Sequence, residues 1–245
     1  SILSNSINIL SRLSSYFLRG LYYLNYINNA LDGHQIHSPY VFNLYSALIK
    51  NNGSRFKPRK IHQQLLTLEE INASIASKKT HQYIADLVPH LGLQSLLYVH
   101  YDSGSHSKNV LSQIKFISTR IKETTWVSTG VASPPTQKSD LNEKKFKIDP
   151  KASFFHIINR DLYEMVILDI SWIREDLSDY LTLLSSIHQP PKAILFLNIH
   201  LNPQNHQSWK SITNDAKISL TIDLFHIGLV FLNLKMEKQH FVLKS

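Results

Sequence analysis

The fold class is decided by residues 165–198, which read MVILDISWIREDLSDYLTLLSSIHQPPKAILFLN. Two uninterrupted apolar runs, 165–168 and 193–197, are each followed by a polar residue, Asp169 and Asn198. Between the runs, four apolar residues recur with the spacing of one helical face: Leu177, Tyr180, Leu181 and Leu184. Strands that are buried on both faces read as continuous apolar runs, so this stretch predicts two parallel strands joined by a crossover helix.

The same alternation continues towards the N-terminus. Residues 96–99 are another apolar run, followed by the turn-like residues 102–105 and a helical segment at 110–117. Residues 125–128 are predicted to be a further strand, and the polar residues 130–150 a loop with a short helix. The repeated order of strand and helix predicts an α/β domain with a mostly parallel sheet.

The C-terminal part of the chain has a different pattern. After a helix marked by Trp209 and Ile212, strand-like runs follow at 218–225, 229–234 and 240–243. No room for crossover helices remains between these runs, so we expect them to pair antiparallel. Ligands of open α/β sheets bind at the carboxyl ends of the parallel strands, which here are residues 100–106, 128–131, 169–173 and 198–203.

Residues 1–31 are predicted to be one long amphipathic helix, and residues 40–50 a second helix. The apolar stripe of the first helix is Leu3, Ile7, Leu10, Phe17, Leu21, Leu24 and Leu31. This stripe could pack on its own domain, dock a partner protein or lie on a membrane surface. The segment has two Arg, no Lys and no acid before Asp32. Two positive charges are few for a helix on a membrane surface, so that interpretation is disfavoured. The same composition is also typical of a transit peptide. We divide the chain into an N-terminal helical extension, 1–60, and an α/β domain, 61–245.

Composition excludes some chemistries and leaves others open. The net charge of +8 could attract nucleic acid, an anionic membrane or an acidic protein, but the basic runs at 55–60 and 144–147 are short, so nucleic-acid binding rests on charge alone. The absence of cysteine excludes disulfides, cysteine–zinc sites and thiol catalysis. No apolar run is long enough to span a bilayer. The pairs His34/His37 and His200/His206 lack the tight spacing of metal ligands, so we expect no metal.

Two local strings give a narrower resemblance. Residues 34–43, HQIHSPYVFN, resemble the "HGIHSPFVFD" segment of a group of Bacteroidetes S-adenosylmethionine (SAM) dependent methyltransferases. Residues 220–231 resemble that group's "tIDLF..GLVF" tail. The resemblance implies a Rossmann-like class I methyltransferase sheet that ends in antiparallel strands, SAM as the cofactor, and a bacterial, cytoplasmic protein. It gives residues 37–39 a structural role, as a turn that holds the N-terminal helices against the domain.

The expected SAM site departs from the family pattern. The family's "LELGTSxGxST" becomes residues 97–107, LYVHYDSGSHS, in which Gly104 survives while Tyr98 replaces the acid and His100 the first glycine. Thr129 stands where the family has an acid that accepts hydrogen bonds from the ribose hydroxyls of the cofactor. Of the family's "DGNH" segment only the acid is kept, as Asp169. The paired acids of "DDIHW" are absent from residues 197–201. The positions that would face the cofactor are His100, Tyr101, Gly104, Thr129, Asp169 and Asn198.

These losses favour a protein that kept the fold while SAM binding was lost or weakened. It would act as a binding or scaffold subunit, with a protein partner docked through the N-terminal helix. The alternative is an active SAM-dependent methyltransferase that uses Gly104 and Asp169 for the cofactor and Asn198 or His200 towards the substrate. No catalytic residue is assigned, because Asp169 could also simply cap the turn that follows its strand.

Overall fold

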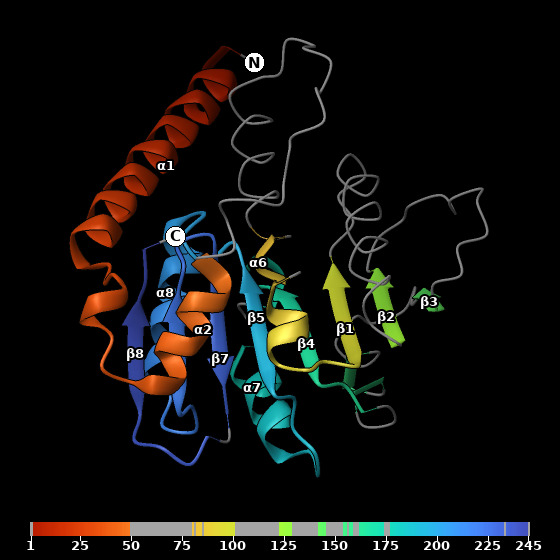
Figure 1. The fold of residues 1–245 in the computed structure, drawn as a ribbon. Helices are drawn as coiled ribbons and strands as arrows, with labels where there is room; N and C mark the ends of the chain where they lie inside the picture. The colour runs from red at the N-terminus through yellow and green to blue at the C-terminus, as the bar shows by residue number, and fades with distance from the viewer. Residues whose placement is uncertain are drawn as a thin grey trace, which may run out of the picture.

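The structure is a computed structural model with one eight-stranded sheet (Figure 1). It describes residues 2–49, 80, 82–84, 86–100, 123–128, 142–145, 154–155, 157–158, 162–173, 177–232 and 234–244. The strand order is β3-β2-β1-β4-β5-β7-β6-β8. The strands are β1 (Ser95–His100), β2 (Glu123–Ser128), β3 (Asn142–Lys145), β4 (Met165–Asp169), β5 (Ala193–Leu197), β6 (Leu220–Asp223), β7 (Ile227–Phe231) and β8 (Gln239–Val242).

The parallel part of the sheet confirms the predicted mixed α/β class. Strands β3, β2, β1, β4 and β5 all pair in parallel, and the chain order changes direction between β1 and β4. Such a change of direction opens a crevice at the carboxyl ends of the strands. The predicted strand at 125–128 lies within β2. The loop and helix predicted for 130–150 are wrong at residues 142–145, where the polar segment Asn-Glu-Lys-Lys adds β3 to the edge of the sheet.

The C-terminal strands pair differently from the expectation in one respect. Strand β7 runs antiparallel to both β5 and β6, as predicted. Strand β8, however, pairs in parallel with β6. Because β7 lies between β5 and β6, both of its edges are occupied, and β8 can join only at the outer edge of β6. The prediction that all three runs pair antiparallel with one another is therefore wrong for β8.

Helices cover both faces of the sheet because residues along each strand alternate between two apolar clusters. In β4, Ile167 belongs to the cluster that includes residues of α2 (Pro39–Ile49), whereas Leu168 belongs to the cluster that includes residues of α7 (Leu177–Ser186) and α8 (Pro203–Asn214). A short helix, α6 (Ile170–Ile173), follows β4. The strands at the centre of the sheet are thus buried on both faces, as their continuous apolar sequences require.

The N-terminal helix α1 (Ile2–Asn29) confirms the predicted long helix. Figure 1 shows it rising obliquely past the edge of the sheet at β8. Among the side chains of α1 that the structure describes, residues 14 and 16–29, Tyr26 is buried; it packs with Phe225 and with Ala30, just after the helix. By contrast, Phe17 and Leu24 of the predicted apolar stripe are 69% and 58% exposed among the described residues. None of the described helices has both the length and the apolarity needed to cross a bilayer.

The connection between α1 and α2 forms a structured turn. Asp32 caps the 3-10 helix η1 (Gly33–Gln35) by accepting from the backbone of His34. The Ser38 hydroxyl then accepts from the backbone of Val41 in the first turn of α2, at 3.4 Å. Leu31 forms a parallel bridge with Leu243, which fixes this connection against the end of β8. The boundary that we set at residue 60 lies outside the described residues.

Candidate functional site

The expected cofactor positions are only partly described. Asp169 ends β4 and Asn198 follows β5, so both lie at the carboxyl ends of adjacent parallel strands. His100 ends β1, but only its backbone is described. Tyr101, Gly104 and Thr129 lie outside the described residues, as does the basic run at 55–60. The site can therefore be built from the β4 and β5 ends.

The carboxylate of Asp169 is held by two groups of the chain. Its Oδ2 accepts from the Asn198 side-chain amide at 2.8 Å, and its Oδ1 accepts from the backbone N–H of Ser171 at 2.9 Å. The second bond closes the turn after β4, which confirms the turn-capping interpretation of Asp169. The first bond joins the two strand ends directly. Asn198 adopts a left-handed backbone with φ of 62°, a conformation that asparagine tolerates better than most residues.

Two residues that the sequence did not single out complete this arrangement. Asn205, in the first turn of α8, is fully buried, and its Nδ2 donates to the Ser171 hydroxyl and to the Asn198 carbonyl, each at 2.8 Å. Its Oδ1 has no hydrogen-bond partner among the described residues. Asn202 caps α8 by accepting from the backbone of Asn205 at 2.8 Å. We call Asp169, Ser171, Asn198 and Asn205 the strand-end cluster. The sequence signal for Asn205 is the preceding Asn202-Pro203 pair, which is typical of a helix start.

Tyr98 lies beside this cluster in the core. Its side chain is buried in β1. Burial raises the pKa of Tyr98 above its ordinary value, and the negative charge of Asp169 raises it further. The phenol therefore stays protonated and neutral across the physiological range.

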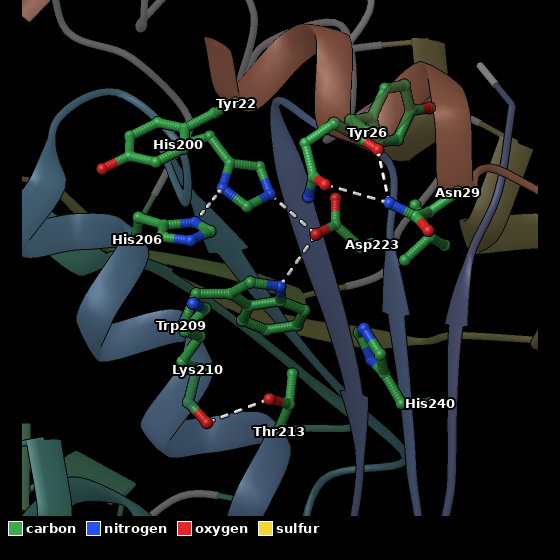
Figure 2. Close-up of a pocket in the computed structure, with 12 residues that line it drawn as sticks. Tyr22, Tyr26, Asn29, His200, His206, Trp209, Lys210, Thr213, Asp223 and His240 are labelled. Atoms are coloured by element: carbon green, nitrogen blue, oxygen red, sulfur yellow. Dashed lines mark hydrogen bonds and ion pairs between the residues drawn. The ribbon is translucent and has the colours of Figure 1, made fainter. Parts of the chain in front are cut away.

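A second cluster of polar side chains lies one strand further along the sheet. His200 Nε2 is 2.7 Å from Asp223 Oδ2, and Trp209 Nε1 donates to the same oxygen at 3.0 Å. The other oxygen of Asp223 accepts from the backbone of Phe225 at 2.8 Å. His200 Nδ1 lies 2.8 Å from His206 Nδ1. Figure 2 shows this chain of contacts, which we call the histidine cluster: His200, His206, Trp209 and Asp223.

The histidine cluster is largely withdrawn from solvent. His200 is 6% and Asp223 4% exposed. Tyr22 of α1 stacks on His206 with ring centroids 4.2 Å apart and an interplanar angle of 19°. A pocket of about 150 Å³ adjoins the cluster, and α1 closes one side of it with Tyr22, Asn25, Tyr26 and Asn29. The His200 side chain thus points towards Asp223 and also lines this pocket.

Part of the signal for this cluster is visible in the sequence. His200 and His206 stand six residues apart, and Asp223 lies in the string at residues 220–231. The contact between His200 and Asp223 could not be seen, because it requires β6 and β5 to be separated only by β7. Among the residues that the structure describes, no group of three or more acidic or histidine side chains is arranged to hold a metal.

The pH dependence of stability provides a test of this environment. Burial, followed by the neighbouring His200 and Lys210, lowers the pKa of His206 from 6.5 to about 4, while Asp223 opposes the shift. The unfolded chain therefore takes up a proton at this residue at higher pH than the folded protein. Between pH values of about 6.5 and about 4, the unfolded state binds more protons, so the stability due to neutral His206 is lost as the pH falls through this window.

We expect the melting temperature of the wild-type protein to fall more steeply than that of His206→Phe over this window. Phenylalanine keeps a ring against Tyr22 but cannot take up a proton. The measurement is thermal unfolding, followed by circular dichroism from neutral pH to pH 4, on both proteins. Parallel curves would contradict the lowered pKa of His206. The other histidines are common to both proteins, so those that do not contact His206 contribute equally to both curves.

Comparison with known proteins identified no relative of this chain. No family model matches the chain, no curated protein matches it, and no solved structure matches it.

Proposed function

We propose that this chain is a class I methyltransferase-fold protein in which SAM binding is lost or weakened, and that it acts as a binding subunit. The fold part of the proposal is supported by the sheet. The chain order of its parallel strands changes direction between β1 and β4, and the C-terminal part of the sheet contains a reversed strand, β7, between β5 and β6, in keeping with the resemblance to class I methyltransferases.

The observation that carries the loss of cofactor binding is the state of Asp169. A SAM site of this class needs strand-end acids whose oxygens can accept hydrogen bonds from the cofactor. Asp169 instead accepts from Asn198 on one oxygen and from Ser171 on the other. Asn198 replaces a second acid, and its amide donates to Asp169, which a carboxylate could not do. A ligand hydroxyl would have to share a carboxylate oxygen with a donor of the chain that already holds it.

The binding role is supported by the outward face of α1. Six large apolar side chains within 12 residues of this helix are more than one-third exposed among the described residues: Tyr16, Phe17, Leu21, Tyr23, Leu24 and Ile27. Contiguous exposed apolar surface of this kind is typical of protein interfaces. The segment carries Arg19 and no acid. The partner that it fits is therefore a protein with an apolar groove bordered by acidic residues.

Calorimetry with SAM and with S-adenosylhomocysteine tests the cofactor part. We expect no saturable heat with the full chain at millimolar ligand. Saturable binding at micromolar ligand that is lost in Asp169→Ala would overturn the weakened site and favour an active methyltransferase on an unknown acceptor. Circular dichroism of both proteins is the control, because Asp169 also closes the turn after β4.

The binding part is tested on the same helix. A candidate partner should bind the wild-type chain and be lost from Leu24→Asp, which changes an exposed residue of α1. Gln189→Asp, at an exposed position in the loop after α7, is the matched control, because both variants add one negative charge. Equal binding by wild type and Leu24→Asp would remove α1 as the docking surface.

A further inference from the structure

The pocket beneath α1 has no part in the proposed function. None of its lining residues belongs to the strand-end cluster. Its walls combine residues from distant parts of the chain: Tyr22 and Tyr26 from α1, His206 and Lys210 from α8, and His240 from β8. It is thus a feature of the complete fold, with aromatic rings on several sides and a hydrogen-bonded chain of side chains behind it (Figure 2).

The direction of the hydrogen bonds behind the pocket follows from Asp223. A carboxylate only accepts, so His200 donates to it from Nε2. We assign the tautomers in which His200 is neutral with its lone pair on Nδ1, and His206 donates to that atom from its own Nδ1. The remaining nitrogen of His206, Nε2, is consequently unprotonated. It has no hydrogen-bond partner among the described residues.

The surroundings of His206 Nε2 define what could donate to it. Lys210 lies one helical turn further along α8, on the same side as His206. The ammonium group of Lys210 favours a ligand whose donor atom gains partial negative charge when it donates a hydrogen bond. A phenol meets this condition better than an aliphatic alcohol, because its hydroxyl is far more acidic. The pocket volume of about 150 Å³ also matches the room that a single benzene ring takes in a protein.

We propose that the pocket beneath α1 is a binding site for a single-ring phenol, whose hydroxyl donates to His206 Nε2. The ring of the phenol packs among the side chains of Tyr22, Tyr26 and Trp209. Asp223 and His200 act as positioning residues, because they fix the orientation of the His206 ring and leave the lone pair on its Nε2. Lys210 stabilises the negative charge that develops on the phenol oxygen.

The test uses phenol itself and anisole, which has a ring of the same kind but no hydroxyl to donate. Both are titrated into the full-length, ¹⁵N-labelled wild-type chain, and the histidine side-chain nitrogens are followed by two-bond proton–nitrogen spectra. We expect saturable binding of phenol at millimolar concentrations, at least tenfold tighter than that of anisole. Before phenol is added, His206 should show an unprotonated Nε2, and the shift of that nitrogen should move on binding.

The variant His206→Phe keeps the aromatic wall and removes the acceptor nitrogen. It should bind phenol at least tenfold more weakly than wild type, while its affinity for anisole stays within about twofold. Equal affinity of wild type for phenol and anisole would overturn hydroxyl recognition, and so would a protonated Nε2 on free His206. Absence of saturable binding would overturn the site altogether. The phenol and anisole comparison on wild type decides the question even if the variant fails to fold. None of these outcomes depends on whether SAM binds.

Discussion

Gly228→Ala is expected to lower the free energy of unfolding by about 3 kcal/mol, at the upper end of the usual cost of overpacking a core. Gly228 lies in β7, between β5 and β6. A Cβ built on this residue would stand 2.4 Å from two ring atoms of Trp209 and 2.9 Å from a third. Trp209 cannot easily move away, because its indole N–H donates to the buried Asp223 and its ring packs near Phe196. The strand or the indole must therefore shift.

The measurement is urea unfolding followed by circular dichroism, with the midpoint compared at an unchanged slope. Gly20→Ala is the matched control, because no atom lies within 4 Å of a Cβ at Gly20. Gly20 is in the middle of α1, where alanine is the better helix former, so this variant should be unchanged or more stable by up to about 1 kcal/mol. If Gly228→Ala were as stable as Gly20→Ala, the close packing of Trp209 against β7 would be wrong.

Asp223→Ala is expected to cost about 4 kcal/mol of unfolding free energy, the range found when one member of a buried polar pair is removed. Three donors lose their acceptor at once: His200 Nε2, Trp209 Nε1 and the backbone N–H of Phe225. Each buried donor left unsatisfied costs about 1–3 kcal/mol, and a water molecule in the vacated space would offset part of the sum.

Glu237→Ala serves as the control for this variant, since Glu237 is an exposed acid and its replacement changes the net charge equally. We expect a change within about 0.5 kcal/mol for it. Chemical unfolding of both variants at neutral pH checks the prediction. A loss of less than about 1 kcal/mol in Asp223→Ala would mean that the three donors find other partners, and that Asp223 does not organise the histidine cluster.

Much of the fold could be predicted because the central strands carry their own signal. The continuous apolar runs predicted β4 and β5, and the spacing of Leu177, Tyr180 and Leu181 predicted the buried face of α7. Strand β3 was missed because its sequence is polar. It lies at the edge of the sheet, where one row of backbone groups pairs with no other strand and an apolar face is not required. Strand β8 was predicted, but its pairing with β6 could not be, because the partner of a strand depends on which strand edges in the sheet are already occupied.

For the candidate site, the sequence predicted which residues lie at the strand ends but not which side chains contact one another. Asp169 and Asn198 were expected at neighbouring strand ends, and they lie there. Their mutual hydrogen bond was not expected, since both were considered as ligands of a cofactor and not as partners of each other. The contact between His200 and Asp223 spans 23 residues and depends on the insertion of β7 between two strands, which no local pattern encodes.

The joining of the two ends of the chain has a consequence for synthesis. Tyr26 of α1 donates its hydroxyl to the carbonyl of Leu243, a residue 217 positions later, and Leu31 bridges to the same residue. At ordinary rates of translation, about 10 to 40 s separate the emergence of these partners from the ribosome. During that interval α1 has no strand to close against. The nascent chain must therefore carry the inner face of α1, which includes Tyr26, uncovered, and a chaperone that binds this face can compete with closure until β8 arrives.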